Sequence, residues 1–303
     1  MVLVAPAPPH RYPAGAPSAG ESTAGRSTAG RSTAGESTSG ESGNGREVLA
    51  LLRGDTDARP LFDPGLAPGL RAWLEDAAYE ASGGGEDGAP VLLGARHLLR
   101  LEDEEGPGGA ADRPSVERLL HRLVLAVFRQ IVHTGAVGDP LGDAVDALVA
   151  GGDVSVLEDV ASLDEEDRAS LSAALACHTR HLCALVPLFA PGWFPRTDDY
   201  VAIPLAGGRV VLHGVFDLLV GLPRPGVSSL CAVGVATGAR NRGRRSLHYL
   251  ALLETLRSGT PPFRMALLES STGRYRVEDV REEHLRAMAA HIAARLPRGD
   301  IDG

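Results

Sequence analysis

The 303-residue chain has 30 basic side chains, all of them arginine, and a formal net charge of −9. Because it lacks lysine, it cannot form a Walker-type phosphate loop, a Schiff base or a lysine-based acid–base site. The acidic balance argues against a general nucleic-acid coat, and the length allows one or two domains.

The first 46 residues read as a low-complexity tail, in which the repeats ESTAG, RSTAG, RSTAG and ESTSG run from Glu21. The repeats are rich in Ser, Thr, Ala and Gly and contain no large apolar side chain. Such a segment buries too little surface to offset the entropy of ordering it, so we expect residues 1–46 to be disordered. The start of the chain has no basic region before its short apolar run, which does not fit a signal peptide.

Apolar residues recur at helical spacing through residues 47–161, which predicts a helical region without catalytic motifs. We expect its helices over residues 47–53, 65–78, 92–101, 115–133 and 139–150. Trp73 and Phe128 fall at spacings typical of a core, so we expect both to pack in the interior.

Residues 162–303 change from a helical period to an alternating one and back. A long helix over 162–188, capped by Ser162, precedes the alternating segments. Strands are expected over 200–205, 209–220, 228–235, 263–269 and 274–277, and helices over 244–257 and 280–296. The sequence therefore predicts an α/β protein, in which a helical N-terminal half precedes a C-terminal α-β-β-β-α-β core.

Several residues of this core form a recognisable pattern. The second strand contains Gly214-Val-Phe-Asp217, the third ends at Thr237-Gly238, and Tyr249 lies in the next helix. Over about residues 162–280 this pattern resembles the RecB-like branch of the PD-(D/E)XK nuclease superfamily. The resemblance implies a restriction-endonuclease-like core whose second strand carries Gly-x-x-Asp and whose third carries Asp/Glu-x-Lys before Thr-Gly.

The chain departs from that family at the catalytic positions. Gly234 stands in place of the second acidic ligand, Ala236 in place of the lysine, and Arg245 in place of a glutamine. Two carboxylates are needed to hold a hard divalent ion that activates water, and only Asp217 remains as a catalytic candidate. The resemblance therefore implies a non-catalytic pseudonuclease without a metal, which acts as a binding or regulatory factor.

An arginine-rich loop follows the third strand and contains Arg240, Arg242, Arg244 and Arg245. Guanidinium groups pair with phosphate in a bidentate manner, and helix N-termini attract anions. The loop is therefore the candidate contact for phosphate or nucleic acid. The partner, either a nucleic acid or another protein, stays open.

Two other hypotheses remain open. The first is an active Mg²⁺-dependent DNA nuclease whose metal ligands have moved to Asp198, Asp199 or Glu254, with His178 and His181 as candidates for the upstream helix residue of the family. The second is a helical interaction or adaptor protein. The odd number of cysteines without metal-type spacing favours reduced thiols in the cytoplasm, and no apolar run is long enough for a membrane span.

Overall fold

The computed structural model describes residues 38–40, 45–54, 59–82, 90–100, 116–222, 227–238 and 242–296. Most of the expected disordered tail, residues 1–37, lies outside this part of the chain. The expectation is wrong for its end, because Thr38–Gly40 forms strand β1 and helix α1 begins at Gly45. Strand β1 pairs through its backbone with a sheet edge, which requires no apolar side chain.

Each helix and strand expected between residues 162 and 303 is present, with ends shifted by a few residues. In chain order they are α7 (Glu165–Leu185), β3 (Arg196–Leu205), β4 (Val210–Val220), β5 (Cys231–Ala236), α8 (Arg242–Ser258), β6 (Arg264–Glu269), β7 (Arg274–Asp279) and α9 (Glu282–Ala293). Strands β3, β4 and β5 form an antiparallel meander. Strand β6 lies parallel to β5, and helix α8 makes the crossover between them.

The preceding elements include more than helices. They are α1 (Gly45–Arg53), α2 (Leu66–Ala81), β2 (Val91–Gly94), α3 (Ala95–Arg100), α4 (Val116–Thr134), α5 (Pro140–Ala150) and α6 (Ser155–Ala161). The helix expected over 92–101 is wrong at its start, since residues 91–94 pair in parallel with β4. A short apolar run reads equally well as a buried strand or as a helix turn, so its periodicity could not decide.

The helix expected from Ser162 starts later than its pattern suggests. Asp164 caps α7, because its carboxylate accepts a hydrogen bond of 2.8 Å from the N–H of Asp167. Ser162 instead ends the separate short helix α6, which the sequence did not predict. The turn between β3 and β4 is the short helix η2 (Ala206–Gly208), in which all three residues have a positive φ.

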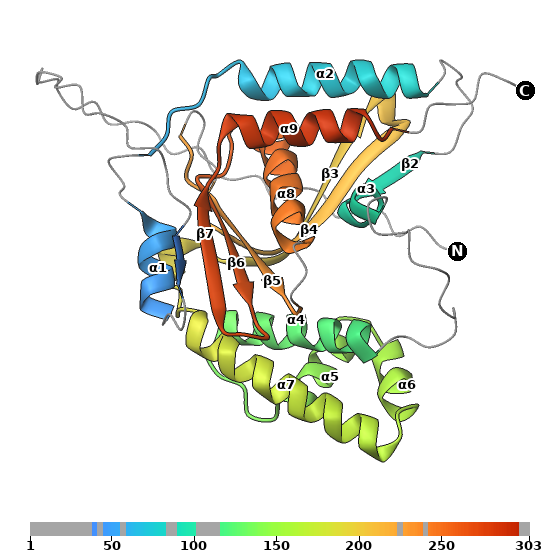
Figure 1. Ribbon diagram of the computed structural model, residues 1–303, viewed down its shortest axis with the longest axis vertical. Coiled ribbons are helices and arrows are strands. Elements are labelled where there is room, and N and C mark those ends of the chain that lie inside the picture. Colours follow the sequence, from blue (N-terminus) through green and yellow to red (C-terminus); the bar gives the residue numbers. More distant parts are fainter. Residues whose placement is uncertain are drawn as a thin grey trace, which may run out of the picture. The chain divides into compact units, whose positions relative to one another are not determined.

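The strands form one mixed sheet in the order β1-β7-β6-β5-β4-β2, with β3 also paired to β4 (Figure 1). Helices α2, α8 and α9 contribute one core, in which Leu70, Leu253 and Ile292 are buried with residues of the sheet. Helices α4 and α7 contribute a second core with Phe128 and Leu182. The mixed α/β class is thus confirmed, and helices from both parts of the chain pack on the strands.

Strand β4 has an unusual edge that positions the motif residues. On one side it pairs with β3 along almost its whole length. On the other side its first four residues, Val210 to His213, pair with β2, and its last three, Leu218 to Val220, pair with β5. Four residues, 214–217, lie between these two ladders. This split in the edge holds the Gly-x-x-Asp motif.

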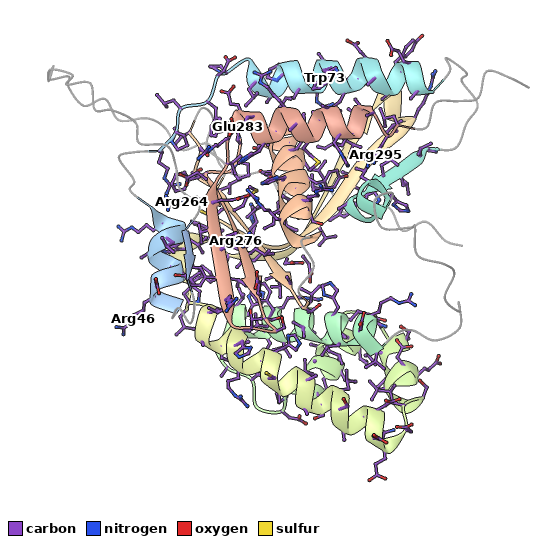
Figure 2. The ribbon with its side chains drawn as sticks, in the orientation of Figure 1. Arg46, Trp73, Arg264, Arg276, Glu283 and Arg295 are labelled. Atoms are coloured by element: carbon purple, nitrogen blue, oxygen red, sulfur yellow. The ribbon has the colours of Figure 1, made fainter. Side chains whose placement is uncertain are left out.

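Among the described helices, none combines the length and apolar character that a membrane span requires. Phe128 is buried as expected. Trp73, labelled on α2 in Figure 2, is 43% exposed, so the expectation that it packs in the interior is wrong. The buried face of α2 is formed by Leu66, Leu70 and Leu74 instead, and Trp73 lies at the edge of that face.

Candidate functional site

The residue Asp217 caps the end of the β4–β5 ladder. Its Oδ2 accepts a hydrogen bond of 2.9 Å from the N–H of Val235, two residues beyond Val233, which forms the last backbone pair with Leu218. Burial raises the pKa of Asp217 to about 6, and Asp198 adds to the rise, while the Val235 N–H opposes it. The carboxyl group therefore already accepts a hydrogen bond from the backbone, and its burial makes ionisation unfavourable.

The position beside Asp217 on β5 offers no ligand. The register that pairs Leu218 with Val233 brings Gly234 next to Asp217. A Cβ at Gly234 would lie 3.0 Å from Cδ2 of Leu247, so an apolar side chain of α8 covers the place where the family carries its second acid. A single carboxylate is a poor ligand set for Mg²⁺, which favours several oxygen ligands in near-octahedral geometry.

The rest of the third-strand motif is held by neighbouring elements. The carbonyl of Ala236 accepts hydrogen bonds from the N–H and hydroxyl of Ser270, at 2.9 and 3.0 Å. Thr237 Oγ1 lies 3.3 Å from Nδ1 of His121 on α4, and Gly238 is exposed. Ala236 provides no charge that could position water or a phosphate.

The two histidines of α7 are also tied to this end of the sheet. Nδ1 of His178 lies 2.8 Å from the hydroxyl of Ser270, and Nδ1 of His181 lies 2.8 Å from its carbonyl. Burial lowers the pKa of His178, which favours its neutral form. Both residues hold the β6–β7 turn against α7, and within the described residues neither is hydrogen-bonded to Asp217.

Gly214 and Tyr249 lie at the gap in the edge of β4, between the residues that pair with β2 and those that pair with β5. A Cβ on Gly214 would lie 2.6 Å from Cδ2 of Leu250, so only glycine lets α8 approach this closely. The hydroxyl of buried Tyr249 donates to the carbonyl of Leu93 at 2.7 Å, and the carbonyl of His213 lies 3.1 Å away. The matched glycine and tyrosine therefore have structural roles, in packing and in joining β2 to β4.

The arginine-rich loop is only partly described. Arg240 lies outside the described residues, and Arg242 begins α8. Arg244 pairs with Glu278 on β7, at 3.0 Å from Nε and 2.8 Å from Nη2 to the same oxygen. Arg245 is exposed. A phosphate at this loop would compete with Glu278 for Arg244.

The acids named for a relocated metal site are each paired with arginine. Asp198 lies 2.9 Å from Arg129, while Arg257 reaches both Asp199, at 3.0 Å, and buried Glu254, at 2.5 Å. Burial raises the pKa of Glu254, although Arg257 opposes the rise. In the part of the chain that the structure describes, these acids and Asp217 do not form a group of three metal-ligating side chains.

A different cluster, which sequence reasoning missed, joins α8, β7 and α9. His248, Glu278 and His284 each offer one ligand atom, and these atoms lie within 4.8 Å of one another. Burial opposes ionisation of Glu278, but hydrogen bonds from His248 and Arg244 outweigh it and lower its pKa to about 2. The three residues are spread over three elements without a motif spacing, so only the fold could bring them together.

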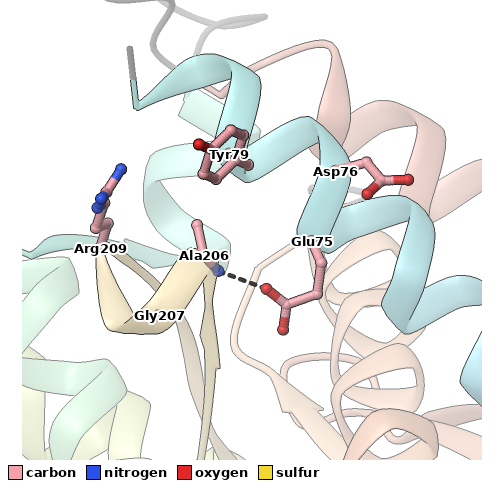
Figure 3. Close-up of a pocket in the computed structure, with 6 residues that line it drawn as sticks. All are labelled: Glu75, Asp76, Tyr79, Ala206, Gly207 and Arg209. Carbon is pink, nitrogen blue, oxygen red and sulfur yellow. Dashed lines mark hydrogen bonds between the residues drawn. The ribbon is translucent and has the colours of Figure 1, made fainter. Parts of the chain in front are cut away.

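A pocket of about 410 Å³ lies between α2 and the turn that follows β3 (Figure 3). It is lined by Glu75, Asp76, Tyr79, Ala206, Gly207 and Arg209. Glu75 accepts a hydrogen bond from the N–H of Ala206, and the Arg209 guanidinium lies 5.9 Å from the centre of the Tyr79 ring. The residues of the RecB-like pattern are not among its lining, so the pocket does not contain the predicted site.

Comparison of the chain with protein-family models and with curated proteins finds no match.

Proposed function

We propose that residues 162–303 form a RecB-like, restriction-endonuclease-like core that has lost its chemistry, and that the chain acts as a non-catalytic binding or regulatory factor. One observation carries the proposal. The carboxylate of Asp217 accepts a hydrogen bond from the N–H of Val235. Its neighbour Gly234 is covered by Leu247 and has no side chain that could complete a metal site. The meander β3-β4-β5 and the parallel crossover to β6 support the resemblance.

The proposed binding surface is the arginine-rich loop at the start of α8. Arg245 is exposed in the first turn of α8, and the neighbouring Arg244 is paired with Glu278. Arginine is suited to phosphate because its planar donors match two oxygens at once. The proposal includes a cytoplasmic location, which is supported by three free cysteines.

Equilibrium binding of a fluorescent DNA duplex tests this surface. We expect micromolar or weaker binding that falls with salt, because phosphate contacts release counterions. Replacing Arg240, Arg242 and Arg245 with Ala should abolish most of the affinity and flatten the salt dependence. The matched control replaces the exposed Arg46, Arg168 and Arg180, which removes the same charge elsewhere.

Equal losses in the two triple variants would contradict a specific contact, because they would indicate attraction by overall charge alone. Unchanged binding in the loop variant would remove the loop from the proposal. Arg244→Ala is made separately, since it also leaves Glu278 without its ion pair.

A further inference from the structure

The cluster of His248, Glu278 and His284 is the group of three metal-ligating residues found among the described residues. It lies apart from the Asp217 motif in the sequence, and the pseudonuclease proposal gives it no role. Its members come from α8, β7 and α9, and Figure 2 labels Glu283, the residue before His284, on α9. A bound ion here would join two helices and a strand.

The geometry needs only small movements to bind an ion. Nε2 of His248 lies 2.6 Å from Oε1 of Glu278, and the His248 and His284 rings stack with centroids 4.7 Å apart. Zinc bonds of about 2.1 Å at tetrahedral angles place ligand atoms roughly 3.4 Å apart. The His248–Glu278 contact would therefore open by less than about 1 Å, and His284, whose ligand atom lies within 4.8 Å of the others, would move inward by at most about 1.4 Å.

An independent observation also points to a missing ligand. Nδ1 of His284 is buried and has no hydrogen-bond partner. Buried polar atoms are nearly always satisfied, so this nitrogen calls for an explanation.

The surroundings of Glu278 suit a metal ligand. Arg244 binds Oε2 through Nε and Nη2, which fixes the carboxylate while Oε1 stays directed at His248. Ligating carboxylates are commonly oriented by such outer hydrogen bonds. Glu283 places another acid near the cluster, 4.0 Å from Nε2 of His284, and is itself paired with Arg281 at 3.3 Å.

We propose that His248, Glu278 and His284 bind one zinc ion, with water in the fourth position. Two imidazole nitrogens and one carboxylate are a ligand set that zinc takes in proteins, and it leaves one position open. Magnesium and calcium prefer oxygen ligands, so the same set discriminates against them. The inference does not depend on the nuclease resemblance.

Isothermal titration of the full chain with ZnCl₂ tests the proposal, after removal of any affinity tag and of metal with EDTA. We expect one ion per chain and no response to MgCl₂. His284→Ala and Glu278→Gln should each weaken zinc binding by at least about 100-fold, since loss of an outer-shell partner alone costs about 10- to 100-fold. His291→Ala is the matched control, because it changes another histidine of α9 outside the cluster and should leave the affinity unchanged.

Cobalt provides a second readout. Co²⁺ bound in this site should give the visible spectrum of a tetrahedral nitrogen–oxygen complex, and this spectrum should be absent in the two ligand variants. Circular dichroism checks that each variant is folded. Glu278→Gln keeps the shape and the Arg244 contact, so it remains informative if His284→Ala does not fold. Absence of zinc binding in the wild type, or binding that survives both ligand variants, would overturn the proposal.

Discussion

The carboxylate of Asp217 accepts a hydrogen bond from the main-chain N–H of Val235, where the backbone ladder between β4 and β5 stops. The side chain thus replaces the carbonyl that a longer ladder would supply. The resemblance implies a metal ligand at this position, whereas the immediate partner of Asp217 is the backbone of the neighbouring strand.

A first prediction concerns the protonation of Asp217. Its pKa rises from 3.8 to about 6 on folding, so its contribution to stability is present below about pH 4 and is lost as the pH rises through 6. Asp217→Asn keeps an oxygen acceptor for Val235 without the charge. We expect this variant to gain stability over the wild type as pH rises, by at most about 3 kcal/mol above pH 7.

Urea unfolding of both proteins across this pH range measures the difference. Asp143→Asn is the control of opposite sign, because a hydrogen bond from Gly138 lowers the pKa of Asp143. Its stabilising contribution is therefore lost as the pH falls through that lowered pKa, and it does not change between pH 6 and 8. A constant difference between wild type and Asp217→Asn at all pH values would contradict the proposed desolvation.

A second prediction tests the packing at Gly214. Alanine at this position would bring its Cβ to 2.6 Å from Leu250 and 3.3 Å from Leu253, so we expect a loss of about 1–3 kcal/mol. Thermal or urea unfolding measures it. Gly69→Ala is the matched control, because Gly69 lies within α2 with no atom near its Cβ position and should gain up to about 1 kcal/mol. Equal effects of the two substitutions would mean that α8 is not in close contact with β4.

A third prediction concerns the buried acid proposed as an alternative metal ligand. Arg257 is the ion-pair partner of both Glu254 and Asp199, and Glu254 is 1% exposed. Arg257→Ala should cost about 3–5 kcal/mol, because it leaves a buried carboxylate without its partner. Combining it with Glu254→Gln should restore much of that loss. If Arg257→Ala is neutral, the acids are available for another partner, and the relocated nuclease site regains support.

Periodicity predicted the C-terminal elements well, because alternating and helical patterns differ clearly in 196–220 and 242–258. It failed at residues 91–94, where an apolar run too short to show a period becomes a strand only through pairing with β4. It failed again at Thr38–Gly40, since pairing through the backbone at a sheet edge leaves no apolar signal.

The sequence predicted those residues of the candidate site that are set by local spacing, but not the contacts that depend on the tertiary fold. Gly214, Asp217 and Tyr249 were identified from the sequence, but their contacts with Leu250, Val235 and Leu93 required the fold. His248, Glu278 and His284 meet from three elements and have no shared motif. Ala236 was informative on its own, because it stands at the lysine position of the resemblance. The chain contains arginine but no lysine, and a general replacement of lysine by arginine would have left a guanidinium at this position.

The proposed loss of catalysis is tested most directly by a cleavage assay. Purified protein is incubated with Mg²⁺ or Mn²⁺ and with linear duplex and single-stranded DNA, beside Asp217→Ala prepared in the same way. We predict no cleavage above buffer for either protein, because Asp217 and Gly234 cannot hold the ion that activates water. Metal-dependent cleavage by the wild type that disappears in Asp217→Ala would contradict the account.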